Sequence, residues 1–426
     1  MSSWFSVVPD GYEVGDRCNC GRRNKKPMPP GRSASLAHCA HVPNGDLVIR
    51  NARLFDPRDL SVTPATSVLV RGDRIVRVAP DADLKPSANA EIIDAHGRFL
   101  MPGLWDNHQH FSDNDGALDL ANGVTSARDM ANDTDTFLQR VARFDNGSEL
   151  GPRVLKAGII DGTGEFAGPT KMRVDTAEQA IQDVDWYADH GYVQIKIYSS
   201  IKPELVPVIA DHAHARGMRV SGHVPAFMSA RQFVEGGADE IQHLNFIVLN
   251  FLFPEVKETR NRDRFIKVAE HAREFTPDKP EVREFINFLK QHHTVLDPTM
   301  SAFEALFCGD PSAITPGLEE IVPRFPPQVA ARDAERRARS SARQSRPLIA
   351  KRSRRCCACS RQFTTPASRL SREPMRWPVT RSTTNSSFMC APVSLPPKFC
   401  AWQRWTPALV MGVDKDRGVI AAGKTG

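Results

Sequence analysis

The feature that most constrains this chain is a regular alternation of strand-like and helix-like segments from Phe99 to about Arg337. Gln194–Tyr198 is a short β-branched run, and the later stretch Glu204–Arg216 carries apolar residues at helical spacing. This order predicts βαβ units, which build a parallel sheet. The length of the region fits a TIM-like (β/α)8 barrel at residues 101–337. The sequence therefore predicts an α/β fold.

A second, smaller domain is predicted from residues 46–100. Its short β-branched segments are each bounded by Gly, Asp, Pro or Asn, which is typical of a small antiparallel sheet: Leu47–Arg50, Ser67–Arg71, Arg74–Val78 and Glu91–Asp94. Residues 1–45 are rich in Pro, Gly and Arg without periodicity. They predict a disordered or poorly packed lead.

Length and composition exclude several classes of protein. At 426 residues the chain is long enough for a barrel and a smaller domain. No run of 18 apolar residues occurs, so neither a membrane-spanning helix nor a membrane partner is expected. The nine cysteines gather near the two ends, with only Cys308 between them, and fit neither a disulfide framework nor a paired metal site. Residues 1–21 lack the apolar core of a secretory signal, so the chain as written is expected in the cytoplasm; an erroneous start or frame could hide a signal, and export stays open.

Two histidines, His108 and His110, end the first strand-like run of the barrel region. Side chains at positions i and i+2 share one face of a strand, so both imidazoles are expected to point into the barrel at its C-terminal rim. That spacing suits chelation of one divalent ion. A His-x-His pair alone is weak evidence, because short motifs often match by accident.

Three further residues lie on later strands of the same region. Lys196 lies mid-strand between two isoleucines, where desolvation disfavours a charged amine; the plain alternative is a lysine that reaches solvent or pairs with an acid. His223 and His243 each end a strand, and each alone is more often a packed or surface histidine than a ligand. Four histidines and one lysine at the ends of barrel strands are hard to assign to chance. Together they predict a metal-binding hydrolytic site.

These motifs resemble the amidohydrolase superfamily, and within it the branch of imidazolonepropionase-like enzymes, prolidases and related carboxypeptidases. The resemblance is carried by Met101–His110, Gln194–Ser200, Ser221–Pro225, Glu240–Leu244 and Thr294–Thr299, the last of which is similar to the seventh barrel strand of the branch. It spans about 46–335 and resumes at 406–424. There Gly418–Lys424 looks like the chain returning to the small domain, which implies a β-sandwich built from 46–100 and 406–426.

The resemblance implies a binuclear metal centre. His108 and His110 would hold the more buried metal ion, and His223 and His243 would hold the second. Lys196 would be carboxylated by CO2, and its carbamate would bridge both ions. Nitrogen and oxygen ligands without a thiolate suit Zn²⁺. The expected chemistry is attack of a metal-bridged hydroxide on an amide carbonyl.

The substrate class follows from the same resemblance, because the branch mainly cleaves C–N bonds. We expect a small-molecule amide that carries a free carboxylate: a dipeptide, an N-acyl amino acid or an ochratoxin-like amide. Tyr198 follows Lys196 on the same face of the strand and would donate a hydrogen bond to substrate, although plain packing explains it equally well. Whether the chain forms homo-oligomers is left open.

Residues 338–405 break the pattern. They hold 14 Lys or Arg and one acid, Glu373, and no helix or strand period persists. The family's strand-eight aspartate, which moves a proton between water and leaving amine, is expected here and is not found. We interpret the segment as translated out of frame, in place of the last barrel strand and helix. If Arg372–Trp377 is encoded CGG GAA CCG ATG CGA TGG, reading from the third base gives Gly-Thr-Asp-Ala-Met, and Gly-Thr-Asp is the family's strand-eight signature.

Two alternatives stand beside an active hydrolase. The chain as written could be a metal-binding but catalytically defective relative, because it lacks the aspartate and because an open barrel leaves two unpaired edges. The basic block could also attract phosphate non-specifically. It has no helical face or repeated motif, so we expect no nucleic-acid partner.

Overall fold

The computed structural model describes residues 6–7, 45–300 and 401–425, with isolated positions between 302 and 335. Most of the predicted lead at 1–45 lies outside the described residues, and so does the aberrant segment up to residue 400. The interpretation of both segments, including the missing aspartate, the reading frame and the exact domain limits, therefore stays a prediction.

The first described part of the chain is a small mixed sheet. Its strands are β1 (Ser6–Val7), β2 (Asp46–Phe55), β3 (Val62–Arg71), β4 (Arg74–Pro80), β5 (Glu91–Asp94) and β6 (Phe99–Met101). Their order is β1-β6-β2-β3-β4, and β5 pairs with β2 in parallel. One face buries a compact apolar cluster that includes Ile49, Val68, Ile75 and Leu100. The alternation of apolar and polar residues thus gives a sheet with one packed face.

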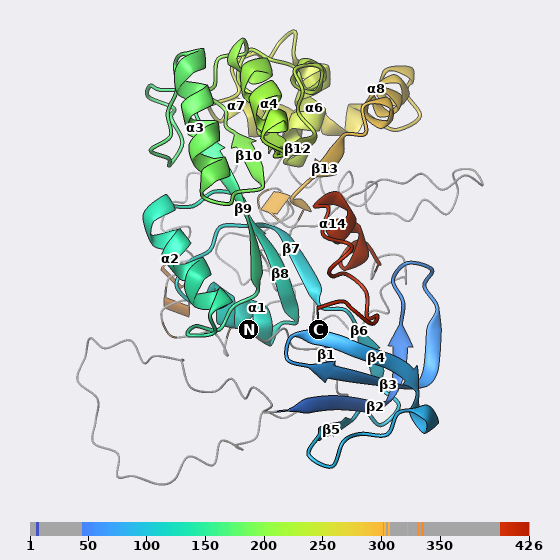
Figure 1. The fold of residues 1–426 in the computed structure, drawn as a ribbon. Helices are drawn as coiled ribbons and strands as arrows, with labels where there is room; N and C mark the ends of the chain where they lie inside the picture. Colours follow the sequence, from blue (N-terminus) through green and yellow to red (C-terminus); the bar gives the residue numbers. More distant parts are fainter. Residues whose placement is uncertain are drawn as a thin grey trace.

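The second part is a curved parallel sheet of seven strands (Figure 1). These are β7 (Leu104–Gln109), β8 (Val124–Asp129), β9 (Arg153–Ile160), β10 (Gln194–Ile197), β11 (Arg219–Gly222), β12 (Glu240–Gln242) and β13 (Val295–Asp297). Each pairs in parallel with its sequence neighbour, so the order runs without interruption from β13 to β7. Within the described residues β7 and β13 are its two end strands.

Helices follow the strands, as a TIM-like barrel requires. They are α1 (Asp115–Ala121), α2 (Thr134–Asp145), α3 (Ala177–Asp189), α4 (Leu205–Ala215), α5 (Ala230–Glu235), α6 (Leu244–Leu252), α7 (Asp263–His271) and α8 (Pro280–Gln291). Two short 3-10 turns lie at Asp81–Asp83 and Ala272–Glu274. The start of α3 shows how the sequence sets a boundary: Thr176 and Gln179 form a reciprocal capping box.

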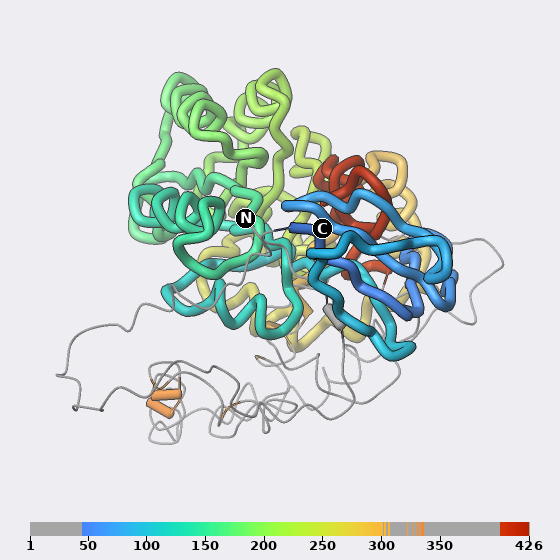
Figure 2. Tube along the Cα trace, turned by 60° about the horizontal axis from the view of Figure 1, so that its bottom comes forward, coloured from blue at the N-terminus to red at the C-terminus, as the bar shows by residue number. Residues whose placement is uncertain are grey.

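The last described segment joins both parts of the molecule. It contains α14 (Trp405–Val410), and just before it the Gln403 carbonyl accepts a hydrogen bond from the backbone N–H of Trp105 at 3.0 Å. Further on, the Gly423 N–H donates to the Ile75 carbonyl at 2.8 Å, and the Ile75 N–H donates to the Lys424 carbonyl at 2.9 Å. Figure 2 shows this red segment beside the blue sheet. The two ends of the chain therefore meet at the small sheet.

The predicted fold class is confirmed: the chain forms a TIM-like α/β barrel, open at one side within the described residues, with a small β domain. The predicted strands at 194–198, 219–223 and 240–243 each end one residue earlier in the structure, so Tyr198, His223 and His243 each lie directly after a strand. In the described part of the chain, no helix combines the length and hydropathy needed to cross a bilayer.

Candidate metal centre

His108 and His110 project from the end of β7. His108 is buried, with 3% of its surface exposed, whereas His110 is exposed. The His110 Nδ1 donates to the backbone carbonyl of Ala131 at 2.8 Å. The His108 Nδ1 lies 2.6 Å from Oδ2 of Asp297, a carboxylate at the end of β13. Each imidazole thus has its Nδ1 engaged by an oxygen and its Nε2 turned elsewhere.

Lys196 lies in β10 with 1% of its surface exposed. Its Nζ is 3.4 Å from Nε2 of His108, and none of the described acids comes within ion-pair distance of it. Burial lowers the pKa of this amine to about 8, although the charges of Asp297 and Asp129 act in the opposite direction. A considerable neutral fraction is therefore present near neutral pH, and a neutral amine is the form that can add CO2.

His223 follows β11 directly after Gly222, a position where the structure leaves no room for a side chain. A Cβ on Gly222 would lie 2.0 Å from the Ile197 carbonyl oxygen, and its φ is +153°. The close approach of the two strands lets the His223 N–H donate to that same carbonyl at 3.0 Å. The His223 Nδ1 lies 2.9 Å from Oγ of Ser199, and its ring stacks on Tyr198 with centroids 4.0 Å apart.

His243 lies between β12 and α6 in a strained backbone conformation, with φ +67° and ψ +122°. Its N–H donates to the backbone carbonyl of Asp297 at 2.7 Å, which holds that conformation. Its Nδ1 lies 2.8 Å from Oγ1 of Thr299. The ring centroids of His108 and His223 are 4.8 and 4.7 Å from that of His243. The structure therefore brings together the side chains that the sequence singled out.

The electrostatic setting keeps these histidines neutral. Burial is the largest cause of a lowered pKa at His108, His223 and His243, and the positive charge of Lys196 lowers all three further. The pKa of His110 is lowered by desolvation and by Lys196, against its hydrogen bond to Ala131. Neutral imidazoles are the form that binds metal.

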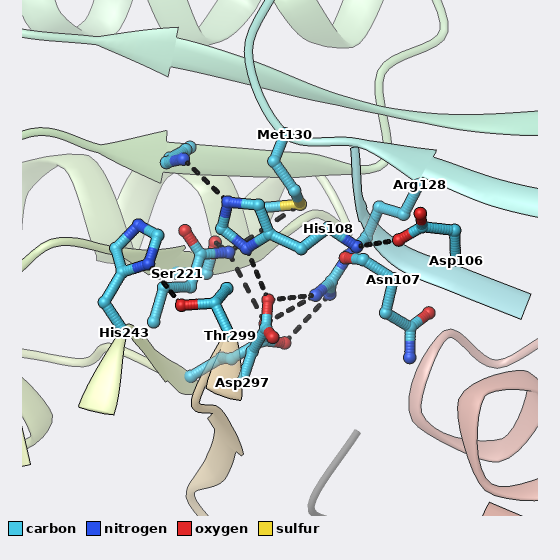
Figure 3. A network of polar contacts seen from close by, with 12 residues as sticks. Asp106, Asn107, His108, Arg128, Met130, Ser221, His243, Asp297 and Thr299 are labelled. Carbon is cyan, nitrogen blue, oxygen red and sulfur yellow. Dashed lines mark hydrogen bonds and ion pairs between the residues drawn. The ribbon is translucent and has the colours of Figure 1, made fainter. Parts of the chain in front are cut away.

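A buried charge network that sequence reasoning missed lies beside the histidines (Figure 3). The guanidinium of Arg128 in β8 donates to both carboxylate oxygens of Glu240 at 2.6 and 2.9 Å, and it lies 3.5 Å from Oδ2 of Asp297. It also donates to the Asn107 carbonyl at 2.8 Å and to Oε1 of Gln194 at 3.1 Å. One side chain of β8 thus contacts four other strands of the barrel.

Burial dominates the titration of this network. Desolvation raises the pKa of Asp297 well above its ordinary value, with Arg128 opposing the shift. Glu240 is desolvated as well, but its direct ion pair with Arg128 outweighs that cost and lowers its pKa. The direct partner of the Arg128 charge is therefore Glu240, whereas Oδ2 of Asp297 contacts Nδ1 of His108 at 2.6 Å.

The residues present fit a binuclear centre of the predicted kind. Among the described residues, no three or more His, Cys, Asp or Glu side chains form a metal site by themselves. The predicted set has two histidines for each ion and needs Lys196 to complete both. The fit rests on Nδ1 atoms that are all engaged by oxygens, and on a buried lysine that has no acid partner in the described part of the chain.

Comparisons with known proteins give short sequence matches and long structural ones. No family model matches the chain. Adenine deaminase 3 of Rhizobium meliloti is 38% identical over 65 residues, which are 15% of this chain and 11% of that protein. Imidazolonepropionase of Anaeromyxobacter dehalogenans is 39% identical over 75 residues, 16% of this chain and 18% of that protein. The chain thus matches less than a fifth of the length of these relatives.

Among solved structures, a Xaa-Pro dipeptidase with bound methionine in the active site has a TM-score of 0.56 and 16% identity, over 89% of this chain and 92% of that one. The A. niger ochratoxinase has a TM-score of 0.53 and 15% identity, over 89% and 88%. Molinate hydrolase has a TM-score of 0.54 and 14% identity, over 91% and 89%. At these identities the likeness shows a shared fold.

Proposed function

We propose that this chain, which has the fold of the amidohydrolase superfamily as its motifs predicted, is built as a metal-dependent hydrolase of amide bonds. The two residues of the β7 motif, His108 and His110, would hold one divalent ion. His223 and His243 would hold the second. Lys196, carboxylated by CO2, would bridge them. Zn²⁺ suits this nitrogen and oxygen donor set.

One observation carries the proposal. Each of the four histidines has its Nδ1 within 2.9 Å of a protein oxygen: a carboxylate for His108, a backbone carbonyl for His110, and a hydroxyl for His223 and for His243. Metal-ligating histidines almost always use the nitrogen that does not bind metal in this way, since the bond fixes both the tautomer and the plane of the ring. Four such bonds around one buried lysine are not needed for packing.

The protein side of the chemistry follows from this arrangement. Two divalent ions, when bound, supply Lewis acidity and lower the pKa of water. The chain supplies neutral imidazoles in fixed orientations and the Lys196 amine, which is neutral often enough to be carboxylated. Its carbamate would offset the charge of two dications beside side chains that are largely shielded from solvent, because Lys196 and His108 are both buried.

A cation near the second pair of histidines supports a substrate with a free carboxylate. Arg264 in α7 has a buried Nε without a hydrogen-bond partner among the described residues. Its positive charge acts on Tyr198, and it also lowers the pKa of His223 and His243. A guanidinium that has no acid partner among the described residues suits a carboxylate. We therefore favour a dipeptide, an N-acyl amino acid or an ochratoxin-like amide, with Tyr198 as a hydrogen-bond donor to it.

The alternative is a protein that binds metal at this site but does not hydrolyse a substrate. Asp297 contacts Nδ1 of His108, on the side of the ring away from Nε2, so it is not placed to move a proton between the ions and a leaving amine. None of the described acids, Asp297 included, lies within ion-pair distance of Lys196. A chain that lacks the predicted strand-eight aspartate would then bind metal without hydrolysing its substrate.

The decisive experiment compares the chain as written with a version in which the frame of 338–405 is restored. Zinc per chain would be measured together with hydrolysis of carbobenzoxy-amino acids, dipeptides and ochratoxin A. We expect two zinc ions and hydrolysis in the restored protein, and metal without turnover in the chain as written. If the restored protein binds no zinc, or binds it and cleaves none of these amides, the proposed function is wrong.

A further inference from the structure

We propose that Asp297 is the positioning residue of this centre: from β13 it fixes the His108 imidazole of β7, the other end strand of the described sheet, and links it to the Arg128–Glu240 ion pair. The proposal rests on the proposed function in one respect, since it takes His108 as a metal ligand. It goes further by assigning a role to a residue outside the predicted ligand set.

The contact between Asp297 and His108 joins the two ends of the sheet. His108 comes from β7 and Asp297 from β13, the two end strands of the seven-stranded sheet in the described residues. The distance between Oδ2 of Asp297 and Nδ1 of His108 is 2.6 Å, and both residues are buried, with exposed fractions of 0% for Asp297 and 3% for His108. Backbone hydrogen bonds do not tie these strands to each other, so this side-chain bond holds His108 at a set distance from β13.

His108 is the only one of the four histidines whose Nδ1 partner is a carboxylate; the other partners are neutral oxygens. A carboxylate makes a stronger hydrogen bond than a neutral acceptor, and it stabilises the tautomer that carries the proton on Nδ1. The Nε2 is then unprotonated. It faces Nζ of Lys196 at 3.4 Å, where the bridging carbamate would form.

The rest of the network explains how a buried acid is tolerated there. Arg128 lies 3.5 Å from Oδ2 of Asp297 and is held in place by its two bonds to Glu240. The other oxygen of Asp297, Oδ1, has no hydrogen-bond partner among the described residues. A buried carboxylate that leaves one oxygen unsatisfied is costly. Among the described residues, the polar contacts of the Asp297 side chain, with the His108 ring and the Arg128 guanidinium, are both made by Oδ2. A carboxylate that accepts this cost to contact a ligand histidine is suited to a positioning role.

The test compares Asp297→Asn with a matched control, Glu240→Gln, in the full 426-residue chain. Both substitutions remove one carboxylate from contact with Arg128, but only the first changes the partner of His108. Zinc affinity is measured by competition with a chelator, and folding by circular dichroism. We expect Asp297→Asn to weaken zinc binding about 10- to 100-fold, as the loss of a ligand's hydrogen-bond partner does, and Glu240→Gln to weaken it less than about 3-fold. Equal losses in both variants would overturn the proposal.

A second measurement decides the proposal even if a variant does not fold or the protein binds no zinc. In the metal-free wild-type protein, the ring ¹⁵N signals of His108, assigned by their loss in His108→Gln, report which nitrogen carries the proton. We expect the proton on Nδ1. A spectrum with the proton on Nε2 would overturn the role of Asp297. Absence of zinc binding in the wild type, with the proton still on Nδ1, would count against the proposed function and leave the positioning contact standing.

Discussion

The two halves of the candidate centre hold their histidines by different means. In the charged half, at β7 and β13, the His108 ring is fixed by Asp297 and backed by the guanidinium of Arg128. In the neutral half, at the ends of β11 and β12, the Nδ1 atoms of His223 and His243 lie beside hydroxyl groups. The charged half depends on groups that come from strands far apart in the sequence, whereas the neutral half uses partners close to the ends of adjacent strands.

This difference indicates how rigid each half is. Removing one partner of a buried ion pair strongly destabilises a protein, because the other charge is left buried and unpaired. A neutral hydroxyl hydrogen bond, in contrast, contributes only a modest net free energy to stability. The charged half is therefore part of what holds the barrel together. The neutral half can adjust, and it lies near Tyr198 and the charge of Arg264, whose buried Nε has no hydrogen-bond partner among the described residues. We infer that the charged half fixes the metal position and that the neutral half receives the substrate.

The largest expected effect comes from Arg128→Met. The arginine is 1% exposed, and its loss would remove the cation beside the buried Asp297 and leave the buried Glu240 with only the more distant Arg219 at 3.8 Å. We expect the free energy of unfolding to fall by about 3–5 kcal/mol, measured by urea titration at pH 7.5. A loss below about 1 kcal/mol would mean that the charged half does not stabilise the barrel.

The contrast also explains what the sequence could predict. The barrel, the small domain and the convergence of the histidines follow from local signals: alternating periods, and a histidine after each of three strands. Asp297 was missed because its partner His108 lies 189 residues away, and only closure of the barrel brings them together. Arg128 carried a usable signal: it is a lone cation between Ala127 and Asp129 in a strand, comparable to Lys196 between its isoleucines.

Acid should destabilise the metal-free protein through both halves at once. Burial lowers the pKa of His108, His223 and His243 well below the ordinary value near 6.5, so the unfolded chain binds protons there before the folded chain does. Stability is therefore complete above about pH 6.5 and is lost as the pH falls. Each histidine contributes at most about 1.4 kcal/mol per pH unit, so three contribute at most about 4 kcal/mol per unit, and the raised pKa values of the buried Asp297 and Asp129 reduce this slope.

The check is urea unfolding of the metal-free protein at pH 7.5, 6.5 and 5.5. The matched control is His243→Gln, which removes one titrating ring from the neutral half and should reduce the slope by about a third, given equal contributions. A stability that does not change between pH 6.5 and 5.5 would show that these rings are protonated as readily in the folded protein as in the unfolded chain.

Replacing the cation beside the neutral half should affect substrate rather than stability. Arg264→Met in the frame-restored enzyme is expected to raise KM for a carbobenzoxy-amino acid about 10-fold or more, since a charge-assisted bond to a carboxylate contributes about 1.5–3 kcal/mol. The corresponding amino-acid amide, which has no carboxylate, should be unaffected. Arg260→Met is the control, because Arg260 is already paired with Glu258 at 2.6 Å. An equal loss on both substrates would remove Arg264 from carboxylate recognition.

The smallest effect is expected where a neutral hydroxyl is removed. Thr299→Val keeps the shape of the side chain but deletes the Oγ1 that lies 2.8 Å from Nδ1 of His243. We expect a loss of about 0.5–1.5 kcal/mol in unfolding free energy and a drop in zinc affinity smaller than that of Asp297→Asn. Because Asp297 ends β13 and Thr299 follows it by two residues, a shift of that segment would affect both variants alike. A Thr299→Val protein that binds zinc as weakly as Asp297→Asn would therefore show that the segment, and not the charge of its aspartate, positions the histidines.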